Sequence, residues 1–144
     1  MTPRRAEYKT LHRPWWLTLL AHVWAFFPGT LLGLCVLPIT LLAGGHCRWV
    51  RGCLEIHGGP VAWFLRQGMP WMRGASAMTL GHVILGQDEP LLDLCREHEH
   101  VHVRQYERWG PFFLPAYAVS SCLAWWRGEN PYRQNRFERE AYGE

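Results

Sequence analysis

The chain has 144 residues, of which 49% are hydrophobic and 19% are charged, and its formal net charge is +3. This length predicts one domain with one core, and so small a positive charge argues against a nucleic-acid-binding surface. The five cysteines include no CxxC pair. They therefore indicate free thiols on a reducing side of the membrane, not a disulfide framework.

The first predicted elements are a basic leader, Met1–Arg13, and an uncharged apolar segment, Pro14–Ala43. Because a spanning helix needs about 20 apolar residues, we expect this segment to enter a lipid bilayer. Pro28–Gly29 divides it, so it is either one kinked span or a re-entrant hairpin. Basic residues on both flanks favour the hairpin and a cytoplasmic location for the rest of the chain, in a membrane of the bacterial inner type. Residues 1–46 thus form the predicted membrane region, and residues 47–144 form a separate domain.

The remaining elements predict an α+β fold, mostly helical with a small β-sheet. Two short strands are expected because β-branched or alternating apolar residues end at glycines, and an amphipathic segment is expected between them. Three helices follow, the first of them marked by apolar residues at i, i+3, i+4 and i+7. In order, these ranges are Cys53–His57, Pro60–Arg73, Ala77–Leu85, Asp88–Trp109, Phe112–Trp126 and Tyr132–Tyr142.

A metal-binding pattern lies in the first of these helices, where residues 98–102 read HEHVH. His98 and His102 are one turn apart, so both imidazoles reach one ion, and Glu99 projects beside it as a general base. Zinc suits such a site because it lowers the pKa of bound water to near neutrality. We therefore predict a Zn²⁺ site. A di-iron site is less favoured because the other E-x-x-H pair, Glu97 and His100, lies on the same helix.

A third ligand must come from another part of the chain, since zinc in a catalytic site takes three protein ligands. Residues 138–142 read EREAY on the last predicted helix. Glu138 and Glu140 point to nearly opposite sides of a helix, so only one of them can face the metal. Glu138 is preferred because it shares a face with Ala141, which allows close helix packing.

The order of strand, HExxH helix and glutamate-bearing helix resembles the gluzincins, a family of zinc peptidases, over residues 77–142. The resemblance implies a zincin-like domain that hydrolyses peptide bonds, with His98, His102 and Glu138 holding Zn²⁺ and Glu99 as the base. It also implies that a strand binds extended peptide and that a side chain stabilises the transition state; the candidates for that donor are Tyr117, Tyr106 and His82. Membrane gluzincins often read E-x-x-A-D, whereas this chain has Tyr142 at the last position.

Two functions remain open at this stage. One is a membrane-associated zinc metallopeptidase acting on a peptide or protein substrate. The other is a catalytically inactive metal-binding membrane protein that serves as a structural or accessory subunit of a larger complex. The expected partners are the lipid bilayer, such a substrate and membrane-protein subunits, without nucleic acid. His22, His57 and His82 are interpreted as structural residues, and no partner stands at helical spacing from His22.

Overall fold

The computed structural model describes residues 14–68 and 74–144 and has an α+β fold with a mixed four-stranded sheet. The predicted fold class is confirmed at this level. The predicted leader, Met1–Arg13, and the last five residues of the predicted segment Pro60–Arg73 lie outside the described residues.

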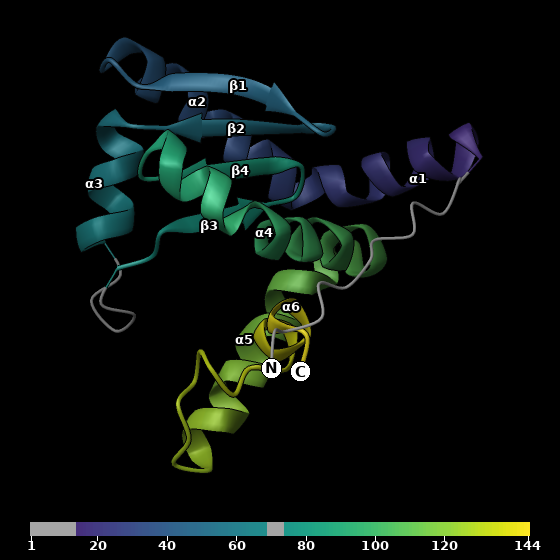
Figure 1. Ribbon diagram of the computed structural model, residues 1–144. Coiled ribbons are helices and arrows are strands. Elements are labelled where there is room, and N and C mark those ends of the chain that lie inside the picture. Colours follow the sequence, from purple (N-terminus) through teal and green to yellow (C-terminus); the bar gives the residue numbers. More distant parts are fainter. Residues whose placement is uncertain (1–13, 69–73) are drawn as a thin grey trace, which may run out of the picture.

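The sheet has the strand order β1-β2-β4-β3, so β3 lies at an edge (Figure 1). Two antiparallel hairpins, β1 with β2 and β3 with β4, are joined by parallel pairing of β2 with β4. The predicted strand Cys53–His57 is confirmed as β2, whereas β1 was not predicted. The strand bounds are His46–Val50 for β1, Cys53–His57 for β2, Ala77–Leu80 for β3 and Val83–Gly86 for β4.

The single strand predicted over Ala77–Leu85 is wrong, because the chain turns back at Gly81 and His82 to make β3 and β4. Gly81 has a φ of +62°, which side-chain-bearing residues rarely adopt. A Cβ atom there would also lie 2.2 Å from Thr30 Oγ1. The turn therefore needs a glycine both for its backbone conformation and for its close contact with Thr30.

Helices cover both faces of the sheet. Two of them, α2 (Leu31–Leu42) and α3 (Gly59–Gln67), pack on one face. Their core is a cluster of buried aliphatic residues: Ile56, Val61, Leu65, Val83 and Leu85. On the other face, α4 (Glu89–Trp109) packs around Cys53, Ile84, Leu92 and Val103. Because Leu34, Val36 and Leu37 of α2 join the first cluster, the apolar segment and the sheet share one core.

The apolar segment Trp15–Leu42, whose most apolar 18-residue window has a mean hydropathy of 2.0, is long and apolar enough to cross a membrane. It bends between α1 (Trp15–Ala25) and α2, within the short π-type turn η1 (Phe26–Thr30), where Phe27 has non-helical dihedral angles. The predicted division near Pro28–Gly29 is thus confirmed. From the bend, α1 runs away from the sheet and contacts α4 (Figure 1).

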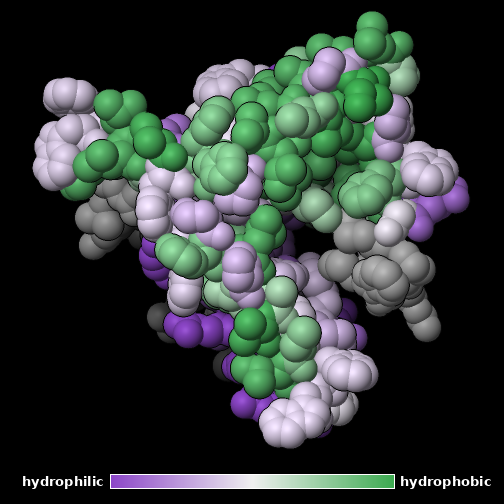
Figure 2. Space-filling model, turned by 180° about the vertical axis from the view of Figure 1, so that it is seen from behind, coloured by the Kyte–Doolittle hydropathy of each residue, from purple (hydrophilic) through white to green (hydrophobic). Residues whose placement is uncertain are grey.

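The outer side of this segment is apolar. Figure 2, which views the molecule from behind, shows hydrophobic side chains gathered over it. Exposed large side chains on α1 and α2 include Trp15, Trp16, Leu19, Val23, Leu32, Ile39 and Leu42. One side of α2 is therefore packed on the sheet, and the other is free for lipid or for another apolar partner.

The C-terminal part supplies three further helical elements. Asp88 caps α4 by accepting a hydrogen bond from the Leu91 backbone N–H at 2.9 Å, so the predicted helix is confirmed. A short 3₁₀ turn, η3 (Gly110–Phe112), leads into α5 (Phe113–Trp126), as predicted. The last helix, α6 (Arg136–Tyr142), is shorter than predicted, because turns occupy the residues before Asn135.

Asn135 fixes the start of α6 on α5. Its side chain is fully buried and accepts a hydrogen bond from the Phe137 backbone N–H at 2.9 Å. Its amide nitrogen donates to Tyr117 O at 3.0 Å and to Ser121 Oγ at 2.7 Å. These bonds explain both where the helix begins and how it is held beside the metal-binding pattern of α4.

Candidate metal centre

Three predicted ligands meet between α4 and α6. His98 Nε2 lies 3.2 Å from His102 Nε2 and 3.2 Å from Glu138 Oε2, and His102 Nε2 lies 3.4 Å from Glu138 Oε1. Their side chains are 18%, 8% and 4% exposed for His98, His102 and Glu138, respectively. The helix spacing brings the two histidines together, and the packing of α6 adds the carboxylate.

These spacings fit a tetrahedral metal ion. Zinc–nitrogen and zinc–oxygen bonds of about 2.0–2.1 Å at tetrahedral angles place neighbouring ligand atoms about 3.3–3.4 Å apart. The two histidine nitrogens are 3.2 Å apart, close to that edge length. Each lies at a similar distance from a different Glu138 oxygen, His98 Nε2 3.2 Å from Oε2 and His102 Nε2 3.4 Å from Oε1. Glu138 Oε2 is also buried, and apart from its 3.2 Å contact with His98 Nε2 it has no hydrogen-bond partner among the described residues. The donor set and its spacing therefore suit zinc.

Gln105 sets the orientation of His102. Its Oε1 lies 2.8 Å from His102 Nδ1. Because an amide oxygen only accepts, Nδ1 carries the proton and Nε2 is left with a lone pair directed at the site. Gln105 is itself held by donating to Phe137 O at 3.0 Å and to Glu140 Oε2 at 3.1 Å. The same side chain therefore orients one ligand and attaches α6.

Glu99 is buried beside the three ligands, with 5% of its surface exposed. Thr79 on edge strand β3 donates a hydrogen bond to Glu99 Oε2 at 2.7 Å. Burial raises the pKa of Glu99, although the nearby His102, Thr79 and His98 oppose that shift. A carboxylate with a raised pKa is better matched to accepting a proton near neutral pH.

Electrostatic coupling links Glu138 to the two histidines. Burial alone would raise the pKa of Glu138, but hydrogen bonding to His102 and His98 outweighs it and holds this pKa below its usual range. Burial would lower the pKa of His102, but hydrogen bonding to Glu138 outweighs it and raises the pKa. The site therefore favours a carboxylate anion next to positive charge, which is the environment that a divalent cation provides.

The three candidate transition-state donors lie in different places. Tyr117 on α5 donates a hydrogen bond to Glu138 Oε1 at 2.6 Å, so it borders the site. Tyr106 is buried against Phe113, and its hydroxyl has no hydrogen-bond partner among the described residues. His82 belongs to a second group with His22 and Glu107. Of the three, Tyr117 is the one that contacts a ligand.

Tyr142 occupies the position where the gluzincin pattern has an aspartate. Its ring centroid lies 4.6 Å from that of His98. Within residues 14–68 and 74–144, His98 Nδ1 is buried without a hydrogen-bond partner. His98 is therefore positioned by an aromatic contact, whereas His102 is positioned by a hydrogen bond.

Glu97, a member of the second E-x-x-H pair, lies away from the site. It forms an exposed ion pair with Arg51 at 2.6 Å. His100 lines a separate cavity that includes His22 and His82. His100 therefore does not join His98 and His102 in their group.

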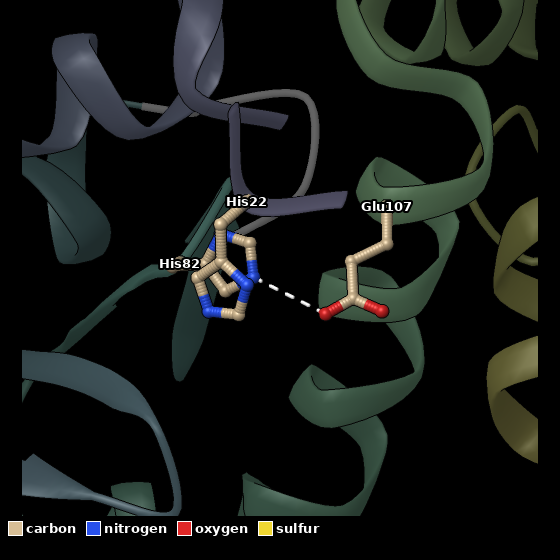
Figure 3. A group of neighbouring side chains, drawn as sticks. All are labelled: His22, His82 and Glu107. Carbon is tan, nitrogen blue, oxygen red and sulfur yellow. Dashed lines mark hydrogen bonds and ion pairs between the residues drawn. The ribbon is translucent and has the colours of Figure 1, made fainter. Parts of the chain in front are cut away.

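A second group of metal-type donors was missed by sequence reasoning. His22 on α1, His82 in the β3–β4 turn and Glu107 on α4 place their ligand atoms within 4.8 Å of one another (Figure 3). They are far apart in sequence, so no spacing rule marks them. The one signal was His22 itself, an ionisable residue in an otherwise uncharged apolar segment.

Comparison of the chain with protein-family models, with curated proteins and with solved structures yields no match.

Proposed function

We propose that the protein is a membrane-associated zinc metallopeptidase of the gluzincin type. The observation that carries this proposal is the meeting of His98, His102 and Glu138, whose ligand atoms lie within 4.8 Å of one another between α4 and α6. In addition, Glu99 lies at the same site with a raised pKa, and an apolar segment provides a means of membrane attachment.

The residues have separate roles in this proposal. His98, His102 and Glu138 hold the ion, which when bound supplies Lewis-acid activation of water for hydrolysis. Glu99 accepts the proton that the attacking water loses and passes it to the amine leaving group as the peptide C–N bond breaks. Tyr117 now donates its one O–H to Glu138, and it would act as the donor to the developing oxyanion by transferring that hydrogen bond from the carboxylate.

The test compares zinc content and peptide cleavage in the full-length protein, purified in detergent. Glu99→Gln should retain zinc and lose cleavage of a quenched-fluorescent peptide library, because it removes the base and leaves the ligands. Glu97→Gln is the matched control, since Glu97 is two residues away and exposed; it should keep both properties. Cleavage by Glu99→Gln at the wild-type rate would contradict the proposed role.

The burial of the site favours a second candidate, a structural zinc centre in an accessory subunit. With Glu138 4% and His102 8% exposed, the ligands offer little surface to a peptide, and a bound ion would hold α6 on α4. This function predicts one bound zinc, loss of folding stability on chelation, and no cleavage even by the wild-type protein. Metal content and cleavage measured on the same sample separate the two functions.

A further inference from the structure

From the group formed by His22, His82 and Glu107, we infer a second metal site, which takes a divalent first-row transition ion and links α1 to α4. Imidazole nitrogens and a carboxylate are suitable ligands for zinc and for its neighbours in that row. The three residues come from three separate elements (Figure 3). An ion bound there would therefore cross-link the apolar segment to the helix that carries the first site.

His22 presents a lone pair to this group. Its Nδ1 lies 2.8 Å from the carbonyl oxygen of Thr18, one turn earlier on α1. Since a carbonyl only accepts, Nδ1 carries the proton and the other ring nitrogen, Nε2, is free to bind a metal when the ring is neutral. A histidine in an apolar segment needs a polar partner, and this arrangement provides one.

His82 lies beside His22, and Glu107 faces the two histidines from α4. The backbone N–H of His82 donates to Thr30 Oγ1 at 2.9 Å, which ties the β3–β4 turn to the bend η1. His82 Nε2 lies 3.2 Å from Glu107 Oε1, close to the edge of about 3.3–3.4 Å expected between ligands of a tetrahedral zinc ion. Their side chains are only 8% and 16% exposed.

The charges at the group also favour a cation. The rings of His22 and His82 are stacked with centroids 3.9 Å apart and an interplanar angle of 14°, and Figure 3 shows the Glu107 carboxylate facing them. Because an imidazole binds a metal in its own ring plane, one ring must turn out of this stack when both bind one ion. Two protonated imidazoles at this distance would repel each other. A divalent ion allows both rings to remain neutral while the carboxylate offsets its charge.

A cavity of about 130 Å³ adjoins the group, so an ion and its water ligands have space. His100 also lines it, with its Nε2 buried and without a hydrogen-bond partner among the described residues, but it lies outside the group of three. Two arginines border the cavity as well. Arg51 is paired with Glu97 at 2.6 Å, and Arg104 donates to His100 O at 3.2 Å.

The test uses full-length protein in detergent in which His98→Ala and His102→Ala remove the first site. This double variant is stripped of metal with a chelator, titrated with Zn²⁺ and passed through gel filtration. It should keep one equivalent of zinc. Adding His22→Ala or Glu107→Gln should lose that equivalent. His46→Ala is the matched control, because His46 also stacks on a histidine, His57, at 5.6 Å, and it should change nothing.

Folding does not obscure the result, because the hydrogen bond made by the His22 side chain lies within its own helix. Circular dichroism and the elution volume should therefore be unchanged in His22→Ala. A folded double variant that binds no zinc would overturn the second site, as would a His22→Ala derivative that keeps the full equivalent. If instead the wild-type protein holds one equivalent that survives loss of His98 and His102, the first site fails and the second stands.

Discussion

Glu138 and Glu140 lie two residues apart on α6, and their carboxylates have different partners. Glu138 faces His98 and His102, whereas Glu140 receives hydrogen bonds from Gln105 and Arg108. We predict that Glu138→Gln weakens zinc binding by more than the roughly 10–100-fold caused by losing an outer hydrogen-bond partner. Glu140→Gln should fall within or below that range.

Competition with a zinc chelator measures both affinities under the same conditions, with wild-type protein as the reference. Equal losses for the two variants would mean that α6 acts through its overall position and not through a ligand. A larger loss of affinity for Glu140→Gln would mean that Glu140, and not Glu138, binds the metal.

Sequence reasoning could group the residues that one helix brings together. His98, Glu99 and His102 needed only the helical repeat, and Glu138 needed the additional choice of a helix face. It could not find Thr79 or Gln105 as supports, because their roles depend on which backbone and side chains pack against α4. His22 and Glu107 were missed for the same reason, since their proximity follows from the path of α1 past α4.

At the scale of elements, the ends of strands and helices were less predictable than their existence. The continuous apolar stretch over residues 77–85 hid a two-residue turn, because Gly81 is stabilised there by contact with Thr30 from a distant segment. Strand β1 was missed because its residues, HCRWV, show little regular alternation of polar and apolar side chains. Pairing with β2 makes it a strand.

The packing of α2 on the sheet can be tested at Gly33. A Cβ atom at this position would lie 2.5 Å from Val83 Cβ. Helix propensity alone favours alanine over glycine by about 1 kcal/mol, but overpacking a core costs about 1–3 kcal/mol. We therefore expect Gly33→Ala to lower the thermal melting temperature in detergent.

Cys35→Ala is the control for this change, because Cys35 lies on an exposed part of the same helix and should leave the melting temperature nearly unchanged. An increase in melting temperature with Gly33→Ala would show that α2 is not in contact with β4.

A buried ion-pair network attaches α4 to the sheet and predicts a pH dependence of stability. Glu55 on β2 is fully buried and accepts hydrogen bonds from Arg96 at 2.9 Å and Arg48 at 2.7 Å. Burial alone would raise the pKa of Glu55, but these two arginines outweigh it and lower the pKa. Ionised Glu55 therefore stabilises the folded state at pH values above 4.5, the pKa of this residue in the unfolded chain. This stability is lost as the pH falls through the lower pKa that Glu55 has in the folded protein.

Glu55→Gln should be destabilised at pH 7 by about 1.5–3 kcal/mol, the usual cost of a lost hydrogen bond to a charged group. Arg96 and Arg48, which are 17% and 26% exposed, lose the buried carboxylate but keep their contacts with Asp93. The difference in free energy of unfolding from the wild type should shrink as the pH is lowered below about 4.5. Urea unfolding in the presence of a chelator measures this difference in free energy of unfolding. Glu97→Gln is the control, because Glu97 belongs to an exposed ion pair and its replacement should have little effect on stability. A difference that stays constant into acid would contradict the assignment.

At the scale of the whole molecule, the apolar surface over α1 and α2 predicts firm membrane attachment. The protein should remain with membranes after high-salt and carbonate washes, because the segment Trp15–Leu42 is long and apolar enough to enter the hydrocarbon region. Replacing Leu19 and Val23, which are 56% and 65% exposed on α1, with glutamate should release a large fraction.

Leu94→Glu is the matched control, because Leu94 is 80% exposed on α4 and lies outside the apolar segment. It should stay with the membrane fraction. Release of the wild-type protein by salt alone would show that the attachment is electrostatic and that the segment does not insert.

The most direct test of the metal centre is an anomalous-difference map at the zinc edge, from crystals of the zinc-loaded protein. We predict a peak bound by His98 Nε2 and His102 Nε2 at about 2.0–2.1 Å and by a Glu138 oxygen at about 2.0–2.2 Å. A fully loaded crystal with no peak between these three side chains, or with a peak there whose third protein ligand is Glu140, would contradict the proposed site.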